Sequence, residues 1–282
     1  MRFEKWQAPG NDYLIVERGQ LAHPLTPARV ALLCDPHFGP GGDGVLELSP
    51  PDAPGFVARL RIFNPDGSEA ELSGNGAREA ILYLRRAGWT DAETFSIQTA
   101  AGEIRPTITG PTTCRVDMGR ARLASDAFPS GGPEGHGVVA AGRRDWRFQH
   151  VSIGNPQCAI RVADPDELEA LDLPAIGPDI EHAPLFPRRT NVSFWTELAP
   201  DRIRARIFER GVGETMSSGT GASGAAVAHV LRGGDSPVTV VLDGGELTVD
   251  VGEDLHVDLT GWAEPVYRGE LTAEIVERLG AA

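Results

Sequence analysis

The chain is poor in cysteine and has no long apolar run, and each shortage excludes a class of protein. Its three cysteines, Cys34, Cys114 and Cys158, are odd in number and far apart, so they predict neither a disulfide framework nor a zinc site. No apolar stretch approaches the roughly 18 residues that a membrane-spanning helix needs. The opening residues "MRFEKWQAPG" lack the apolar segment of a secretory signal. Together these shortages predict a protein of the reducing cytoplasm.

Positive charge is also scarce. The 26 lysines and arginines face 40 aspartates and glutamates, for a formal net charge of −14. A nucleic-acid or anionic-membrane partner is therefore not expected, because both are recognised by basic surfaces. The seven histidines include no pair four residues apart, and no metal ion is expected. "GPGGDG" (39–44) has the letters of a dinucleotide-binding loop, but "VLEL" after it is typical of a strand rather than the required helix.

The chain does contain an internal repeat. "ARLRIFNPDGSEAELSGNGA" (58–77) and "IRARIFERGVGETMSSGTGA" (203–222) align without a gap, and both end in Ser-Gly-x-Gly-Ala. The offset of about half the chain is far longer than the roughly 20–50 residues of a solenoid unit. The repeat therefore predicts a duplicated domain whose halves face each other about a pseudo-twofold axis.

Each half is expected to be rich in strands. Segments such as "LRIF", "FSIQTA", "RIRARIF", "VTVVLDG" and "LTVDV" alternate or carry β-branched residues. Apolar stretches at 77–88 and 222–231, each after a serine motif, predict helices. The expected fold is α/β (α+β): two pseudo-symmetric domains, each a curled, mostly antiparallel sheet around a central helix, with the active site in the cleft between them. We assign residues 1–118 and 265–282 to the first domain and 119–264 to the second.

The two serine motifs form glycine-rich corners. A small-residue turn before a helix leaves backbone N–H groups unpaired and adds the positive end of the helix dipole, which together suit an anion. One such motif alone would indicate only a helix-capping serine. Two motifs at matching positions of the repeat instead favour a single carboxylate bound by both, with the adjacent carbon between the side chains of Ser73 and Ser218.

At these residues the chain resembles the diaminopimelate epimerases, cofactor-independent enzymes that invert one amino-acid α-carbon. The resemblance covers nearly the whole chain, in the order and spacing of that family. Its most specific part is "ERGVGET" followed by "GTGA", and it also includes "APGNDYLIV", "FNPDGSEAELSGNGAR", "SIGNPQC" and "RRTNVSF". It implies two pseudo-symmetric α/β domains, no cofactor and a small dicarboxylic amino acid as substrate.

The resemblance also implies which residues hold the substrate. Arg210 would pair with the distal carboxylate, because a guanidinium fork suits a planar oxyanion, and Glu209 would accept a hydrogen bond from an ammonium group. Backbone N–H groups at the two corners would bind the α-carboxylate. The full implied set is Asn11, Asn64, Gly74, Asn75, Asn155, Asn191, Glu209, Arg210, Gly219 and Thr220.

The acid–base positions depart from the family. Ser73 and Ser218 stand where the family has cysteines, which take the α-proton from one face and deliver a proton to the other. A thiol has a pKa of about 8.5, and lower at a helix N-terminus, whereas a serine needs an adjacent base. Gln157 replaces the histidine of the family's "GNPH", and Gly44 stands where many members carry glutamine.

Three functions follow from this pattern. The first is a pyridoxal-phosphate-independent epimerase that interconverts LL- and meso-diaminopimelate, with Ser73 and Ser218 as the acid–base pair. The second is an isomerase or lyase of the same fold acting on a different small acid. The third is a non-catalytic protein that binds a diaminopimelate-like ligand. For the first, the resemblance also implies a cytoplasmic homodimer in lysine biosynthesis.

Overall fold

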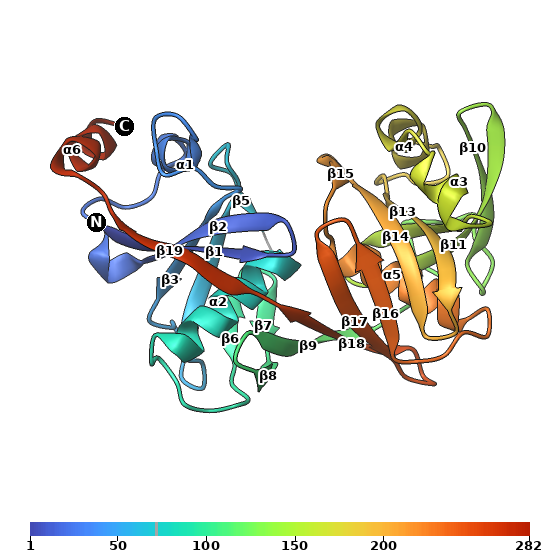
Figure 1. The fold of residues 1–282 in the computed structure, drawn as a ribbon, viewed down its shortest axis with the longest axis horizontal. Helices are drawn as coiled ribbons and strands as arrows, with labels where there is room; N and C mark the ends of the chain where they lie inside the picture. The colour runs from blue at the N-terminus through green and yellow to red at the C-terminus, as the bar shows by residue number, and fades with distance from the viewer. Residues whose placement is uncertain (71–72) are drawn as a thin grey trace. The chain divides into compact units, whose positions relative to one another are not determined.

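The computed structural model describes residues 1–70 and 73–282, and the chain forms two compact units (Figure 1). Unit 1 is Met1–Val116 with Gly261–Ala282, and unit 2 is Asp117–Thr260. The chain enters unit 2 within strand β9 (Thr113–Arg120) and returns within β18 (His256–Trp262). These bounds differ by a few residues from the division proposed from the sequence.

Unit 1 is organised by a sheet that has eight strands in the described residues, in the order β19-β1-β2-β3-β4-β6-β7, with β5 paired to β4. Its strands are β1 (Arg2–Ala8), β2 (Asn11–Glu17), β3 (Val45–Ser49), β4 (Ala58–Phe63), β5 (Glu69–Ala70), β6 (Ile97–Thr99), β7 (Gly102–Ile104) and β19 (Glu264–Glu270). Its helices are the short η1 (Arg18–Gln20), α1 (Pro27–Cys34), α2 (Gly74–Arg86) and α6 (Ala273–Ala281).

The second sheet has the order β10-β11-β12-β13-β14-β16-β17-β18-β9-β8, with β15 paired to β14. Besides β9 and β18, its strands are β8 (Pro106–Gly110), β10 (His136–Ala141), β11 (Arg144–Ser152), β12 (Pro156–Arg161), β13 (Asn191–Ala199), β14 (Arg202–Glu209), β15 (Gly213–Thr215), β16 (Val238–Leu242) and β17 (Gly245–Val251). Unit 2 carries the helices α3 (Pro165–Glu169), α4 (Leu173–Glu181) and α5 (Gly219–Val230).

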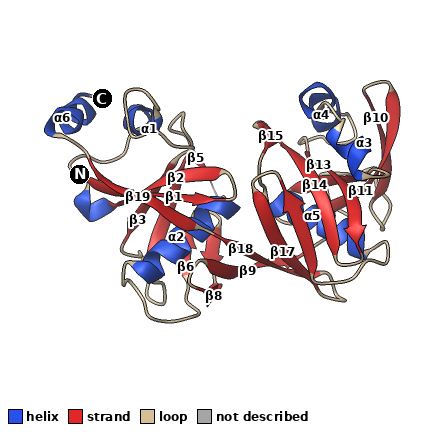
Figure 2. Cartoon of the chain, in the orientation of Figure 1, coloured by secondary structure: helices blue, strands red, loops and turns tan. Residues whose placement is uncertain are grey.

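Both units repeat one topology. In unit 1, β2 pairs in parallel with β3 and β4 with β6, and the connections carry α1 and α2. In unit 2, β12 pairs in parallel with β13 and β14 with β16, and the connections carry α3, α4 and α5. A parallel pair requires such a crossover. The shared order is the structural counterpart of the sequence repeat, and Figure 2 shows strand dominating both units.

Helices α2 and α5 fill the cores of their units. Ile81 of α2 is fully buried in a cluster with residues of β1 to β4, and Ala225 of α5 is fully buried among residues of β11 to β17. Nearly every residue of α5 is buried and many are alanine or glycine, because a helix surrounded by packed side chains leaves little room for large ones. Truncating a buried core residue such as Ile81 to alanine costs about 2–5 kcal/mol.

The α/β class and the two core helices expected from the sequence are confirmed. Both helices begin earlier than the expected residues 77 and 222, at Gly74 and Gly219. Ser73 and Ser218 are their N-caps, so the glycines that follow lie in the first helical turn. "VLEL" lies in strand β3, as expected. Within the described residues, no helix combines the length and the apolar character needed to cross a lipid bilayer.

Candidate active site

The corner of unit 1 is built on the first turn of α2. Ser73 has an extended backbone (φ −127°, ψ 123°), and its Oγ accepts a hydrogen bond from the Gly76 N–H at 3.1 Å. Gly74 and Asn75 open the helix, where first-turn N–H groups have no intrahelical acceptor. Because the positive end of the helix dipole lies at the same place, these groups suit a carboxylate.

A phenol reaches the same serine. Tyr13, on strand β2, donates a hydrogen bond from its hydroxyl to Ser73 Oγ at 3.2 Å. The Tyr13 side chain belongs to the core of unit 1, and the residue is 6% exposed. The oxygen of Ser73 therefore accepts two hydrogen bonds, one from the backbone and one from Tyr13.

The corner of unit 2 repeats the cap but has a different partner. Ser218 Oγ accepts a hydrogen bond from the Gly221 N–H at 3.2 Å and donates one to Glu209 Oε2 at 2.9 Å. Glu209 ends strand β14, and the tight β14–β15 hairpin, in which Glu209 faces Gly213, brings its carboxylate to the start of α5. Ser218 thus has an adjacent carboxylate, the arrangement that a serine needs to act as a base or nucleophile.

Glu209 is held by two hydroxyl groups. Its Oε1 accepts from Thr215 Oγ1 at 2.9 Å, and its Oε2 accepts from Ser218. Burial raises the pKa of Glu209 above its usual range, and these two hydrogen bonds oppose the rise because they favour the charged form. A carboxylate with a raised pKa is a stronger base, which suits it to take the proton of Ser218.

Two asparagines stabilise the unit 2 corner through hydrogen bonds. Asn191 donates to the Pro156 carbonyl at 3.0 Å and accepts from the Arg210 N–H at 2.9 Å, so it fixes the backbone beside Glu209. Asn155 donates to Thr220 Oγ1 at 3.1 Å and thereby reaches the first turn of α5. The structure brings these implied site residues of unit 2 into one connected group.

Gln157 supports Asn155. Its Nε2 donates to Asn155 Oδ1 at 2.7 Å, and its side chain packs on α5 where Gly224 leaves room, since a Cβ on that glycine would lie 2.8 Å from Gln157 Cβ. Gln157 is fully buried. A glutamine here orients an amide but offers no group that titrates near neutral pH.

The implied residues of unit 1 are less connected. Asn11 donates to Asp43 Oδ2 at 3.0 Å, and Asn64 donates to Ser68 Oγ at 2.9 Å within its own turn. Asn75 Oδ1 accepts from the guanidinium of Arg78. Among the described residues, neither Asn11 nor Asn64 forms a hydrogen bond with Ser73. Their side chains are held by local partners within unit 1.

Sequence reasoning missed two members of the corners, Tyr13 and Thr215. Both lie inside motifs that identify the family, "APGNDYLIV" and "ERGVGET". Tyr13 precedes Ser73 by 60 residues, and its contact depends on the packing of β2 against α2. Thr215 could have been found, because a two-strand hairpin places it across from Ile207, two residues before Glu209.

Two buried charged residues lie next to each other one turn into α2. Arg78 and Glu79 are both fully buried, and both carboxylate oxygens of Glu79 lack a hydrogen-bond partner in the described part of the chain. Burial raises the pKa of Glu79 well above its usual range and lowers that of Arg78. Burial disfavours the charged form of each, so Glu79 holds its proton more tightly than an exposed carboxyl does.

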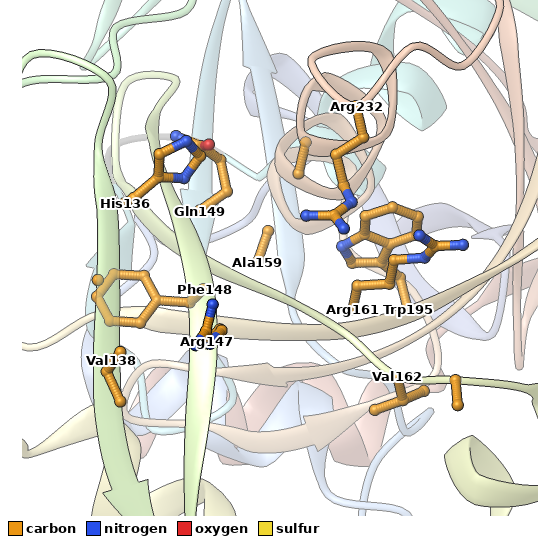
Figure 3. Close-up of a pocket in the computed structure, with 13 residues that line it drawn as sticks. His136, Val138, Arg147, Phe148, Gln149, Ala159, Arg161, Val162, Trp195 and Arg232 are labelled. Carbon is orange, nitrogen blue, oxygen red and sulfur yellow. The ribbon is translucent and has the colours of Figure 1, made fainter.

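Two other groups of side chains lie apart from the serine corners. Arg147, Arg161 and Arg232 line a surface pocket of unit 2 with Trp195 and His136. Figure 3 shows Arg161, Trp195 and Arg232 on one side of the pocket and His136 on the other. None of the residues that form the Ser218 corner lines this pocket.

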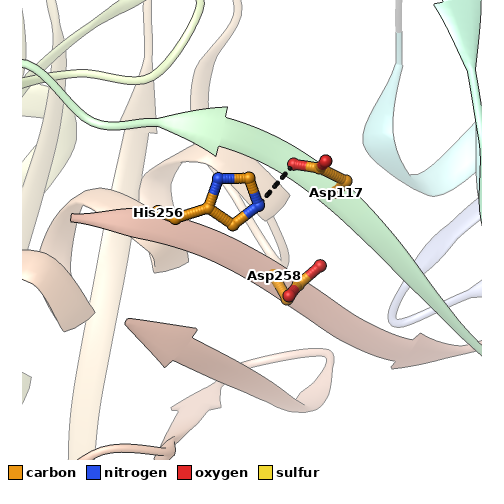
Figure 4. Close-up of side chains that lie close together, drawn as sticks. All are labelled: Asp117, His256 and Asp258. Atoms are coloured by element: carbon orange, nitrogen blue, oxygen red, sulfur yellow. Dashed lines mark ion pairs between the residues drawn. The ribbon is translucent and has the colours of Figure 1, made fainter. Parts of the chain in front are cut away.

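The other group is Asp117, His256 and Asp258, on the neighbouring strands β9 and β18 (Figure 4). Their ligand atoms lie within 4.8 Å of one another, a spacing that would allow a cation. The ion pair of His256 Nε2 with Asp117 Oδ1 at 3.0 Å accounts for two of the three. Strand pairing brings them together, so the spacing of histidines along the chain could not reveal the group.

Comparisons with known proteins find relatives over nearly the whole chain. A model of the diaminopimelate epimerase family matches residues 3–124 and 149–266. A diaminopimelate epimerase from Pelotomaculum thermopropionicum is 41% identical over 280 residues, covering 96% of this chain and 98% of the relative. One from Synechocystis sp. is 39% identical over 278 residues, with the same coverage of each chain.

Solved structures share the fold. A putative phenazine biosynthesis PhzC/PhzF protein from Clostridium difficile matches with a TM-score of 0.68 at 12% identity, over 96% of this chain and 99% of that one. A probable proline racemase from Agrobacterium radiobacter matches with a TM-score of 0.67 at 15% identity, over 96% and 93%. At these identities the likeness shows the two-sheet α+β fold alone.

Proposed function

The chain belongs to the diaminopimelate epimerase family, and from this premise we propose that it interconverts LL- and meso-diaminopimelate by proton transfer at the α-carbon, without pyridoxal phosphate. Family membership makes the chain an isomerase and supports a role in lysine biosynthesis. The observation that carries the proposal is the hydrogen bond from Ser218 to Glu209, because it supplies the base that a serine in place of cysteine requires.

The proton transfer has a defined direction in this proposal. Glu209 takes the hydroxyl proton of Ser218, and the serine oxygen takes the α-proton from one face of the substrate. The electron pair of the broken C–H bond stays on the α-carbon and its carboxylate. Ser73 then gives its hydroxyl proton to the opposite face, which inverts the centre and leaves an oxyanion on Ser73. Exchange with solvent then returns a proton to Ser73 and removes one from Glu209. The reverse reaction runs the same steps backwards.

The two helix N-termini would bind the α-carboxylate. N–H groups of Gly74 and Asn75 in unit 1, and of Gly219 and Thr220 in unit 2, open α2 and α5. Hydrogen bonds to this carboxylate grow in strength as charge develops on it, so they favour the transition state over the ground state. They lower the barrier to removal of the α-proton.

The remaining implied residues would recognise the rest of the substrate. Arg210, whose side chain donates to the Arg188 carbonyl at 3.0 Å, would pair with the distal carboxylate. Asn155 and Asn191 would contact the substrate from their braced positions beside α5, and Asn11 and Asn64 from unit 1. The homodimer and the cytoplasmic location rest on the family alone; sedimentation of the purified chain as a monomer would remove the dimer from the proposal.

Conversion of LL- to meso-diaminopimelate, followed by chiral chromatography, tests the proposal. We expect turnover by the native protein and its loss in Ser218→Ala. Ser217→Ala is the matched control, because Ser217 is the neighbouring buried serine and its Oγ has no hydrogen-bond partner in the described residues. Equal rates for the two variants would contradict the assignment of Ser218.

A further inference from the structure

The two serines differ in the direction of their hydrogen bonds. Ser218 donates a hydrogen bond to the carboxylate of Glu209. Ser73 Oγ instead accepts hydrogen bonds from the Tyr13 hydroxyl at 3.2 Å and from the Gly76 N–H at 3.1 Å. A hydroxyl whose oxygen already accepts two hydrogen bonds keeps its own proton for a third group. The same two donors would stabilise the oxyanion that Ser73 becomes after releasing the proton.

The ring of Tyr13 occupies space that Gly44 leaves open, and it lies beside Gly76. A Cβ on Gly44 would lie 2.5 Å from Tyr13 Cε1, and a Cβ on Gly76 would lie 3.4 Å from Tyr13 Cε2. A side chain at position 44 would therefore collide with the ring, and also with the Phe63 carbonyl oxygen, 2.4 Å from that Cβ, as real Cβ atoms do not approach a neighbour so closely. Gly44 and Tyr13 form one arrangement that points the phenol at Ser73.

We propose that Tyr13 is a positioning residue that makes Ser73 the proton-donating partner of the pair, with Gly44 providing the space for its ring. This inference rests on the proposed epimerisation. When Ser73 gives its proton to the α-carbon, the negative charge left on Ser73 Oγ is held by the Tyr13 hydroxyl and the Gly76 N–H. In the reverse direction the same oxyanion accepts the α-proton. Tyr13 therefore donates a hydrogen bond to its serine, whereas Glu209 accepts one from Ser218.

A thiol introduced at position 73 tests the contact without substrate. In Ser73→Cys the thiolate would accept the same two hydrogen bonds, and its ionisation is followed by ultraviolet absorbance. The native thiols stay silent at moderate pH, because burial raises the pKa of Cys34 and Cys114 to about 12 and that of Cys158 well above its usual range. The introduced thiol is thus the one that titrates.

Adding Tyr13→Phe to Ser73→Cys should raise the pKa of the introduced thiol by about one unit, because the phenol no longer favours the charged form. Tyr83→Phe is the matched control: Tyr83 is a buried tyrosine of unit 1 whose hydroxyl donates to Glu17 at 2.8 Å. It should leave the thiol unchanged. An unchanged pKa with Tyr13→Phe overturns the proposal.

Kinetics in D₂O give the second measurement. Tyr13→Phe in the otherwise native chain should lower kcat for inversion about tenfold with little change in KM. The rate of α-proton exchange without inversion should fall less than the rate of inversion. Ser218 still removes the α-proton in this variant, whereas Ser73 delivers a proton to the opposite face more slowly. Equal losses of exchange and inversion would contradict the role of Tyr13. Absence of any exchange in the native protein would refute the epimerisation instead, and the thiol titration would still decide the contact.

Discussion

Glu209→Gln removes the proton acceptor of Ser218 with little change of shape. The carboxylate accepts hydrogen bonds at 2.9 Å from both Ser218 and Thr215, and a glutamine keeps one acceptor oxygen but cannot take up a proton near neutral pH. A positioned general base contributes roughly 10²–10⁴-fold, or about 3–5 kcal/mol of activation free energy. We expect kcat for epimerisation to fall by that factor.

The pH dependence of kcat tests the same role of Glu209. Burial raises the pKa of Glu209, so the carboxylate takes up a proton at a higher pH than an exposed glutamate does. As the pH is lowered, the native kcat should therefore begin to decline at a pH above the ordinary glutamate range. Because glutamine has no proton to gain, this decline should be absent in Glu209→Gln.

The assay is the initial rate of LL-to-meso conversion, with Glu214→Gln as the matched control. Glu214 lies opposite Phe208 in the same hairpin, and its carboxylate pairs with Arg206 at 2.6 Å rather than with Ser218. The control should stay within about twofold of the native rate, as surface substitutions outside the site usually do little. A Glu209→Gln rate equal to that of the control would refute Glu209 as the base.

Two further predictions concern titrating groups outside the proton-transfer step. The native protein should keep its activity in iodoacetamide, because its three cysteines are buried and burial raises the pKa of each thiol. The double substitution Ser73→Cys with Ser218→Cys should make the protein sensitive to iodoacetamide. Inactivation of the native chain by the reagent would contradict this prediction. Glu79 holds its proton in the fold, while the unfolded chain loses it above the ordinary value of 4.5, so its contribution to the free energy of unfolding falls as pH rises. Glu79→Gln should flatten the decline of Tm as the pH rises above the ordinary glutamate value of 4.5, and identical slopes in the two proteins would refute the raised pKa of Glu79.

The repeat at 58–77 and 203–222 predicted much of the fold. Strand β4 and helix α2 in unit 1 have counterparts β14 and α5 in unit 2, with a serine at the N-cap of each helix. This worked because alternation, glycine corners and helix caps are local signals that a short window of sequence contains.

The partners of the two serines could not be predicted in the same way. The two motifs themselves differ at a single position, yet Ser73 meets a tyrosine and Ser218 meets a glutamate. Tyr13 reaches its serine through the packing of a strand against a helix, which no local pattern reports. The position that matches Glu209 in the first half is Asn64, and its side chain turns to Ser68. The functional difference between the halves therefore lies in tertiary contacts.

Exchange of the α-hydrogen with solvent tests the central claim most directly, namely that a serine pair with one adjacent carboxylate moves a proton at this carbon. The native protein is incubated in D₂O with LL- and with meso-diaminopimelate, and deuterium at the α-carbon is followed by mass spectrometry. We predict incorporation of α-deuterium from either isomer, and its loss when Ser73→Ala is combined with Ser218→Ala. No α-deuterium after prolonged incubation at high protein concentration would contradict the account.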